Sequence, residues 1–300
     1  MIKKRVAGRF LLLGSASPSL VRGVSESLAG RISYVDLSPL QLSEILPTYN
    51  MNTHWYRGGF PNAFLAPNDS FFANWAESFV RGYVERDFNH LFGLSLNPSL
   101  FMRLWQMLAY NQSNVWNGEE FSRSLGVSAP VTNRYLEIME GAFLVRRLPP
   151  WFNNSGKRLV KTPKVYLRDT GILHYFNRVS SYDDLQGHPI VGASWESYVV
   201  EQIILQKNLG IDAYFYRTHS GAELDLVLVK GDKPLVGIEI KYSNAPSVTR
   251  GFYQSIEDLV TEKNFVITPS SDTFPIRKAT VCSLSHFILK ELEKIGVKSE

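Results

Sequence analysis

The chain has 300 residues, of which 44% are hydrophobic and 20% are charged, and its formal net charge is +4 at pH 7. This composition is typical of a globular protein with sizeable cores, and the length suggests about two domains at ~150 residues each. The single cysteine, Cys282, excludes an intrachain disulfide and a cysteine-rich zinc site. No apolar run approaches the ~20 residues that span a membrane, so we expect a cytoplasmic protein.

The first segment, residues 1–50, predicts a small α/β fragment. Residues 9–15 and 31–40 are expected to form strands, with a helix over 19–30 that ends at Gly30. The basic start resembles a secretory signal, but the apolar stretch 10–13 is shorter than the usual ~7 to 15 residues. A buried parallel strand is therefore the better interpretation.

Residues 51–95 predict a helical layer. Over 69–91, Phe72, Trp75, Phe79 and other apolar residues recur at helical spacing, and Asp69 and Ser70 are candidate caps. We interpret the aromatic residues as core rather than as a cofactor site.

Residues 96–152 predict a winged helix-turn-helix domain. A short helix, a turn, a second helix starting near Ser128 and a strand follow one another over 117–151. The predicted core residues are Phe121, Leu125, Val131, Tyr135, Leu136 and Met139. The second helix would expose its DNA-reading residues near its start, and two arginines would lie on the wing: Thr132, Asn133, Arg134, Arg146 and Arg147. Winged helices also serve in protein interactions, so that alternative stays open.

A basic block over 141–168 supports contact with a polyanion. It holds seven Lys and Arg residues, Lys157 and Arg158 among them, and no acid. Interleaved aromatic residues offer stacking surfaces for bases. The alternative is a solvated basic face beside core aromatics.

Residues 153–300 predict an α-β-β-β-α-β domain. A helix over 189–208 precedes strands over 213–217, 223–229 and 235–243, and a helix over 248–260 precedes a strand over 264–269. A final amphipathic helix is expected over 283–295.

Three charges interrupt the apolar hairpin formed by the second and third of these strands: Asp225, Glu239 and Lys241. Buried carboxylates need a partner, which is either each other with the lysine or a metal ion. Glu239 and Lys241 share a face because they are two residues apart. A three-residue loop, 231–233, would place Asp225 opposite Glu239, whereas a two-residue loop would turn it to the other face. Without a cation, Lys241 or water is expected between the two carboxylates.

This order, with Asp225 followed by Glu239-Ile-Lys241, resembles the PD-(D/E)XK nuclease superfamily. The resemblance adds Glu196 on the preceding helix. It implies a Mg²⁺ or Mn²⁺ site at Glu196, Asp225 and Glu239, and catalysis of phosphodiester cleavage by Asp225, Glu239 and Lys241, the lysine acting on the attacking water or the transition state.

Over nearly its full length the chain also resembles prokaryotic AAA-type ATPases with a C-terminal nuclease-like domain of unknown function. The matching segments include FLLLGSAS, RGGFP, GKRLVKTPKVYLRDTGIL and GAELDLVL. The resemblance implies that residues 1–50 are the end of the ATPase core, with Ser15, Ser17 and Arg31 as remnants of the nucleotide sensor. No G-x-x-x-x-G-K-[ST] motif occurs, so we expect no ATP hydrolysis by this chain, as a truncated product or a fragment of a longer frame.

The expected fold is therefore a multidomain α/β and α+β protein, and the expected function is DNA-associated, with Mg²⁺-dependent cleavage by the last domain. The alternative is a non-catalytic regulator, binding DNA or protein, with a relic nuclease fold. DNA is the expected partner, no membrane is expected, and a homo-oligomer is left open.

Overall fold

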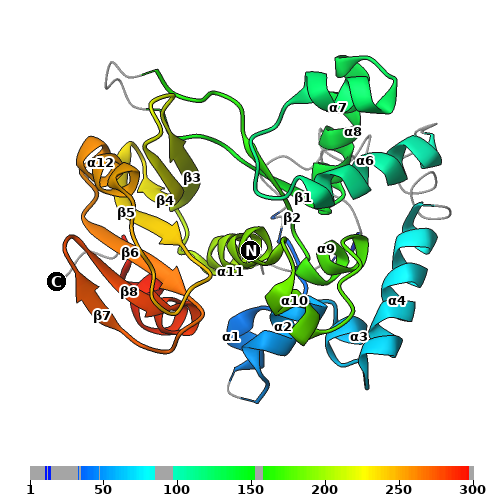
Figure 1. Cartoon of the computed structure of the whole chain (residues 1–300), viewed down its shortest axis with the longest axis horizontal. Helices are drawn as coiled ribbons and strands as arrows, with labels where there is room; N and C mark the ends of the chain where they lie inside the picture. The colour runs from blue at the N-terminus through cyan, green and yellow to red at the C-terminus, as the bar shows by residue number, and fades with distance from the viewer. Residues whose placement is uncertain are drawn as a thin grey trace, which may run out of the picture.

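The computed structural model describes residues 11, 13, 14, 33, 35–46, 48–84, 97–152 and 158–296. They form a mixed α/β structure in which helices dominate the first half and a six-stranded mixed sheet dominates the second (Figure 1). The predicted helix 19–30 and four predicted site residues lie outside the described residues: Ser15, Ser17, Arg31 and Lys157.

The two predicted N-terminal strands are not found where the structure describes them. Residues 11, 13, 14, 33 and 35–40 belong to no strand, and Val35 and Leu37 are exposed. A strand needs a hydrogen-bonded neighbour, and no described residue pairs with this segment in a sheet. The prediction of strands is therefore wrong for these residues.

The part of the chain before residue 188 contains helices that pack around aromatic side chains. The helices described there are α1 (Leu42–Ile45), α2 (Met51–Arg57), α3 (Pro61–Phe64), α4 (Asp69–Gly82), α6 (Pro98–Tyr110), α7 (Gly118–Leu125), α8 (Ala129–Gly141), α9 (Thr170–Phe176) and α10 (Tyr182–Gly187). The cap of α4 is Asn68, whose side chain accepts from the Phe71 N–H, so the predicted caps Asp69 and Ser70 lie one and two positions too late. On α4, Phe72 is buried, and Trp75 and Phe79 pack on the core, as expected.

Helices α7 and α8 are followed by a two-stranded antiparallel sheet, β1 (Val145–Leu148) and β2 (Lys164–Leu167). The turn between the helices begins at Gly126, whose positive φ of 70° suits glycine. Five of the six predicted core residues are buried, but Val131 is 37% exposed. It is exposed because the helical repeat of α8 turns the neighbouring Thr132 inward instead.

Helix α9 packs against α2 through a close glycine contact. A Cβ on Gly171 would overlap the backbone carbonyl of Arg57, so only glycine fits without a shift. Asp169, the N-cap of α9, accepts from the Gly59 N–H at 2.9 Å and the Ile172 N–H at 3.0 Å. The sequence segments RGGFP and RDTGIL therefore meet in space.

A buried histidine ties the same helices to α11 (Val191–Gln206). His174 Nδ1 lies 2.7 Å from the carbonyl oxygen of Tyr56, which can only accept, so Nδ1 carries the proton. Nε2 then accepts from the Ser194 hydroxyl at 2.6 Å, and Ser194 Oγ accepts from the Trp55 indole N–H at 2.9 Å. Burial favours the neutral imidazole that this network uses, because it lowers the pKa of His174 to about 4.

The second half contains the predicted α-β-β-β-α-β order. After α11 come β3 (Asp212–Arg217), β4 (Glu223–Lys230), β5 (Lys233–Ile240), α12 (Arg250–Leu259), β6 (Lys263–Thr268), β7 (Phe274–Ile276) and β8 (Ala279–Ser283). The sheet order is β3-β4-β5-β6-β8-β7, with parallel pairs at β5-β6 and β6-β8 and antiparallel pairs elsewhere. The predicted last helix is present as three short helical pieces: α13 (Leu284–His286), a π-helical turn (Phe287–Glu291) and a 3₁₀ turn (Leu292–Lys294).

The hairpin loop between β4 and β5 differs from the prediction. Lys230 pairs with Lys233, so the loop has two residues rather than three. The register then shifts at a bulge, because Leu228 pairs with Val236 and leaves Leu235 without a partner. Beyond the bulge Leu226 pairs with Ile238, which is the register expected of the longer loop. The bulge therefore keeps Asp225 level with Glu239.

Helix α11 lies between the sheet and the helices of the first half, while α12 covers the other side of the sheet (Figure 1). One continuous core includes Leu42, Phe72, Trp105, Val199 and Leu226, and so draws on all four of the segments predicted as domains. No helix among the described residues combines the length and apolar composition that crossing a bilayer requires.

Candidate functional site

Charged side chains from both halves line an open cavity of about 500 Å³ at one edge of the hairpin. Its lining includes four carboxylates and three cations: Glu196, Glu223, Asp225 and Glu239, with Lys164, Arg217 and Lys241. The loop that follows α6, residues 112–114, forms one wall. All the predicted catalytic and metal-binding residues therefore meet at this cavity.

The hairpin positions two carboxylates and a lysine. Asp225, on β4, accepts from the Ile240 N–H through Oδ2 at 2.8 Å, and this bond holds it against β5. Glu239, on β5, lies 2.6 Å from Lys241 Nζ, as two residues on one face allow. The Glu239 side chain is nearly buried, whereas that of Lys241 is 36% exposed. The lysine is thus the member of this group that reaches the open side.

A second lysine, which sequence reasoning missed, lies among the carboxylates. Lys164 begins β2, and its Nζ lies 2.8 Å from Glu223 Oε1, 3.2 Å from Glu196 Oε1 and 3.5 Å from Asp225 Oδ1. Its side chain is only 4% exposed. The expectation of Lys241 or water between the carboxylates is therefore wrong in part, because Lys164 is the cation that contacts Asp225.

Burial and neighbouring charges shift the ionisation of this cluster. Burial raises the pKa of Glu239, and the charge of Asp225 adds to the rise while Lys241 opposes it. Burial also raises the pKa of Glu196, against the opposing effect of Lys164. For Lys164, burial lowers the pKa, but Glu196 and the other acids outweigh it, so the pKa lies well above its usual value. Burial therefore favours the protonated form of Glu196 and Glu239, whereas the surrounding acids keep Lys164 in its charged form.

The donor set suits a hard divalent cation in its chemistry but not in its present spacing. Carboxylate oxygens are the ligands that Mg²⁺ and Mn²⁺ prefer. Within the described ranges, however, no group of three His, Cys, Asp or Glu side chains is close enough to hold a metal ion. Glu196, Glu223 and Asp225 converge on the ammonium group of Lys164 instead. Lys164 Nζ is therefore the positive charge that these carboxylate oxygens contact.

The predicted DNA-reading residues of α8 are only partly exposed. Thr132 is 1% exposed and its hydroxyl lies 3.4 Å from the Ser128 carbonyl, so the expectation that α8 exposes it is wrong. Asn133 is exposed, and its Oδ1 accepts from the Trp116 indole N–H at 2.9 Å. Arg134 is exposed and pairs with Glu137 at 3.6 Å. Contact between α8 and DNA stays a prediction.

The arginines of β1 are paired within the protein. Arg146 binds Glu201 of α11 through two hydrogen bonds of 2.5 and 3.0 Å, and Arg147 pairs with Glu140 of α8. Among the described residues, β1 therefore does not present Arg146 and Arg147 as unpaired cations. Arg158, in contrast, is exposed.

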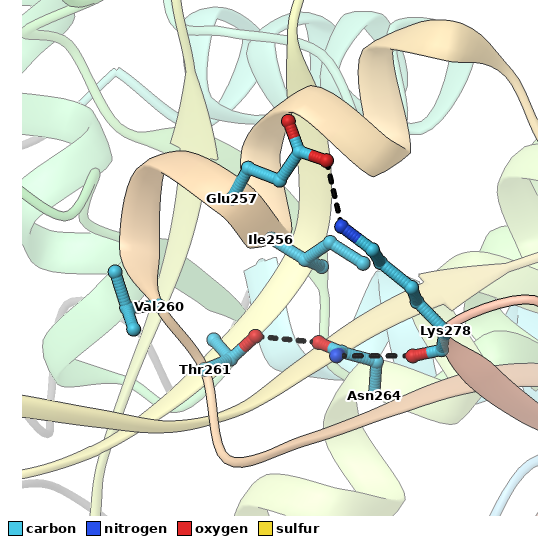
Figure 2. Close-up of a pocket in the computed structure, with 6 residues that line it drawn as sticks. All are labelled: Ile256, Glu257, Val260, Thr261, Asn264 and Lys278. Atoms are coloured by element: carbon cyan, nitrogen blue, oxygen red, sulfur yellow. Dashed lines mark hydrogen bonds and ion pairs between the residues drawn. The ribbon is translucent and has the colours of Figure 1, made fainter.

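Another cavity, of about 410 Å³, lies at the C-terminal end of α12 (Figure 2). Its polar groups are paired with one another: Glu257 with Lys278 at 2.7 Å, and the Thr261 hydroxyl with Asn264 Oδ1 at 2.6 Å. Asn264 also donates to the Lys278 carbonyl at 3.2 Å. No predicted site residue lines this cavity. The cavity lined by Glu196, Asp225 and Glu239, hereafter the acidic cavity, is therefore the better candidate for the functional site.

Two further charged residues of the acidic cavity differ in how far the sequence indicates them. Glu223 lies two residues before Asp225, and this period of two predicts a shared face. Lys164, in contrast, is 61 positions from Asp225, and only the pairing of distant chain segments brings it there.

Comparisons with known proteins match both halves to families without an assigned function. Residues 48–183 match a domain of unknown function (DUF8612), and residues 191–287 match another (DUF4143), which is found in AAA-ATPase-associated proteins. The uncharacterized proteins Rv2008c of Mycobacterium tuberculosis and Mb2031c of Mycobacterium bovis are each 38% identical over 275 residues. The aligned region covers 91% of this chain and 61% of each relative, so the chain spans about three fifths of their length. No solved structure matches.

Proposed function

We propose that the C-terminal half of the chain cleaves phosphodiester bonds in DNA with the help of a divalent cation. One observation carries the proposal: Glu196 of α11, Asp225 of β4, and Glu239 and Lys241 at the end of β5 line one open cavity. A cluster of opposed charges with perturbed ionisation in a cavity is typical of a functional site.

Each residue has a role that its position supports. Asp225 and Glu239, with Glu196 from α11, would hold the cation through their carboxylate oxygens. When bound, the cation would neutralise charge on the phosphate and lower the pKa of a water molecule. Lys241 extends from Glu239 toward the open side, where its ammonium would orient the attacking water or stabilise charge that develops in the transition state.

The test is cleavage of duplex and branched DNA with Mg²⁺ or Mn²⁺. Asp225→Asn and Lys241→Ala should each abolish cleavage and leave DNA binding largely intact, because their roles lie in the transition state. The matched controls Asp232→Asn and Lys233→Ala, at the tip of the same hairpin, should cleave like the parent. Cleavage that survives both site substitutions would contradict the proposal.

DNA would be held by the exposed positions of the predicted DNA-binding set. Among the described residues these include two arginines, Arg134 on α8 and Arg158, whose carbonyl accepts from the His219 N–H. Reversing both charges should weaken binding to all sequences and reduce the slope of log K against log salt concentration, because fewer counterions are released. Arg81→Glu, at an exposed position of α4, is the control. Equal binding by the double variant and the parent would remove DNA contact from these two positions.

A second candidate function is non-catalytic, in which the nuclease-like half is a relic and the chain regulates or binds partners. The position of Lys164 among three carboxylates favours it, since an ammonium there balances the charges without a metal. The two candidates differ in one result: binding of DNA with no cleavage under any divalent cation would support the second.

We also propose that this half works beside an ATPase, as its family match and the resemblance of residues 1–50 suggest. The chain itself lacks a phosphate-binding loop, so purified protein should release no phosphate from ATP above a buffer control. Steady ATP hydrolysis that co-purifies with the chain through successive columns would contradict this.

A further inference from the structure

The side chain of Lys164 is a buried cation in a cluster of acids. Lys164 belongs to β2, outside the sheet that carries Asp225 and Glu223, and Glu196 approaches from α11. Its Nζ lies within 2.8 to 3.5 Å of all three carboxylates. The Tyr166 hydroxyl, on the same strand, donates to Glu196 at 2.7 Å and fixes that carboxylate beside the lysine.

Two of these distances, to Glu223 and Glu196, are those of hydrogen bonds from an ammonium, and the 3.5 Å to Asp225 is a longer ion pair. N–H···O hydrogen bonds are about 2.7 to 3.2 Å long, whereas Mg²⁺ lies about 2.0 to 2.1 Å from its oxygen ligands. A divalent ion held by the same oxygens would have to occupy nearly the same place as Nζ. Two cations cannot share that place, because of both their size and their charge.

We infer that Lys164 is an internal cation that competes with a divalent metal ion for Glu196, Glu223 and Asp225. The inference rests on the metal site of the proposed function. It makes Lys164 the residue that sets the metal affinity of the site, and it makes departure of Nζ a condition for metal binding.

The backbone of Lys164 is held in place, so the side chain must be what moves. Lys164 pairs with Leu148 of β1 and forms an isolated bridge with Val115. The four-carbon stem, in contrast, has rotatable bonds that allow Nζ to leave the acids without a change in the strand. The adjoining open cavity gives the ammonium a path toward solvent.

The experiment measures Mn²⁺ binding to the full chain by titration calorimetry and by electron paramagnetic resonance of free Mn²⁺. Lys164→Met removes the charge and keeps the stem length, and Lys164→Arg keeps the charge. Lys233→Met, which removes an exposed lysine on β5, is the control. We expect Lys164→Met to bind Mn²⁺ at least tenfold more tightly than the parent, while Lys164→Arg and Lys233→Met do not.

Thermal unfolding gives an independent reading. Because a ligand that binds only the folded form stabilises it, Mn²⁺ should raise the melting temperature of Lys164→Met by more than that of the parent. If Lys164→Met does not fold, the charge-balanced double variant Lys164→Met with Glu223→Gln replaces it and is compared with Glu223→Gln alone, which lacks the same carboxylate, under the same tenfold criterion. Equal or weaker Mn²⁺ affinity in the folded variant would overturn the inference.

DNA cleavage measured on the same samples separates this inference from the proposed function. Tighter Mn²⁺ binding by Lys164→Met without cleavage by any sample would support the competition and contradict the nuclease. Cleavage by the parent together with unchanged Mn²⁺ affinity in Lys164→Met would support the nuclease and overturn the competition.

Discussion

Removal of the Glu201 carboxylate should destabilise the protein strongly, because it removes the acid that pairs with two arginines, Arg146 and Arg168, whose side chains are only 22% and 14% exposed. Glu201, on α11, accepts from Arg146 of β1 at 2.5 and 3.0 Å and from Arg168, which follows β2, at 2.7 Å. The Glu201 side chain is 7% exposed. Burial raises its pKa, but the two arginines outweigh this and hold the pKa below its usual value. The carboxylate is therefore ionised at neutral pH.

The size of the effect follows from burial. Breaking a buried ion pair by removing one partner costs about 3 to 5 kcal/mol. The pair of Arg147 with Glu140 provides a matched comparison, since both side chains are about a third exposed. An exposed pair of this kind contributes at most about 1 kcal/mol. Glu201→Ala should thus lose several times more free energy of unfolding than Glu140→Ala.

Urea unfolding followed by circular dichroism measures both losses, with equal m-values as the check that the unfolded states are comparable. Similar midpoints for Glu201→Ala and Glu140→Ala would refute the reasoning. The result also bears on tests of DNA binding. Reversing the charge of Arg146 would place a second acid beside Glu201 and destabilise the fold. Weaker DNA binding by such a variant would therefore reflect instability rather than the loss of a phosphate contact.

Two further results are expected. Burial lowers the pKa of His174 to about 4, so the folded state favours the neutral ring. The stability that comes from keeping His174 neutral is fully present above pH 6.5 and is lost as the pH falls toward 4. The loss is at most about 3 kcal/mol of unfolding free energy. Urea midpoints against pH should show this fall in the parent and in His219→Gln, which alters an exposed ring, and a flatter curve in His174→Gln. Gly171→Ala should lower the free energy of unfolding by about 1 to 3 kcal/mol or more, since the new Cβ would overlap the Arg57 carbonyl. Gly187→Ala is the control and should be nearly neutral, because its Cβ would meet open space. Equal urea midpoints for the two variants would contradict the close contact at Gly171.

The sequence by itself determined the local features of this protein. Apolar spacing located α4, α8, α11 and α12, and alternation placed Glu239 and Lys241 on one face of β5. These features could be predicted because they depend on residues within one or two turns of a helix, or two positions along a strand. The nuclease-like chemistry, DNA binding and the domain borders stay predictions.

Local patterns failed where a more distant partner decided the outcome. The predicted length of the hairpin loop was wrong because a bulge at Leu235 takes the place of the third loop residue. No turn-forming residue in the sequence indicates this bulge. Thr132 is buried and Val131 exposed because the rotation of α8 against its neighbours sets the inward face.

The candidate site shows the same division most clearly. Its hairpin charges stand out in the sequence, because an acid in an apolar strand is costly to bury. Their partner does not stand out: Lys164 reaches Asp225 only because β2 folds against the sheet, across 61 residues of chain. Likewise, the sequence predicts Arg146 as a free arginine of the wing, whereas in the structure it pairs with Glu201, 55 residues away. Charge compensation between distant segments depends on the three-dimensional path of the chain, and only the tertiary structure decided it.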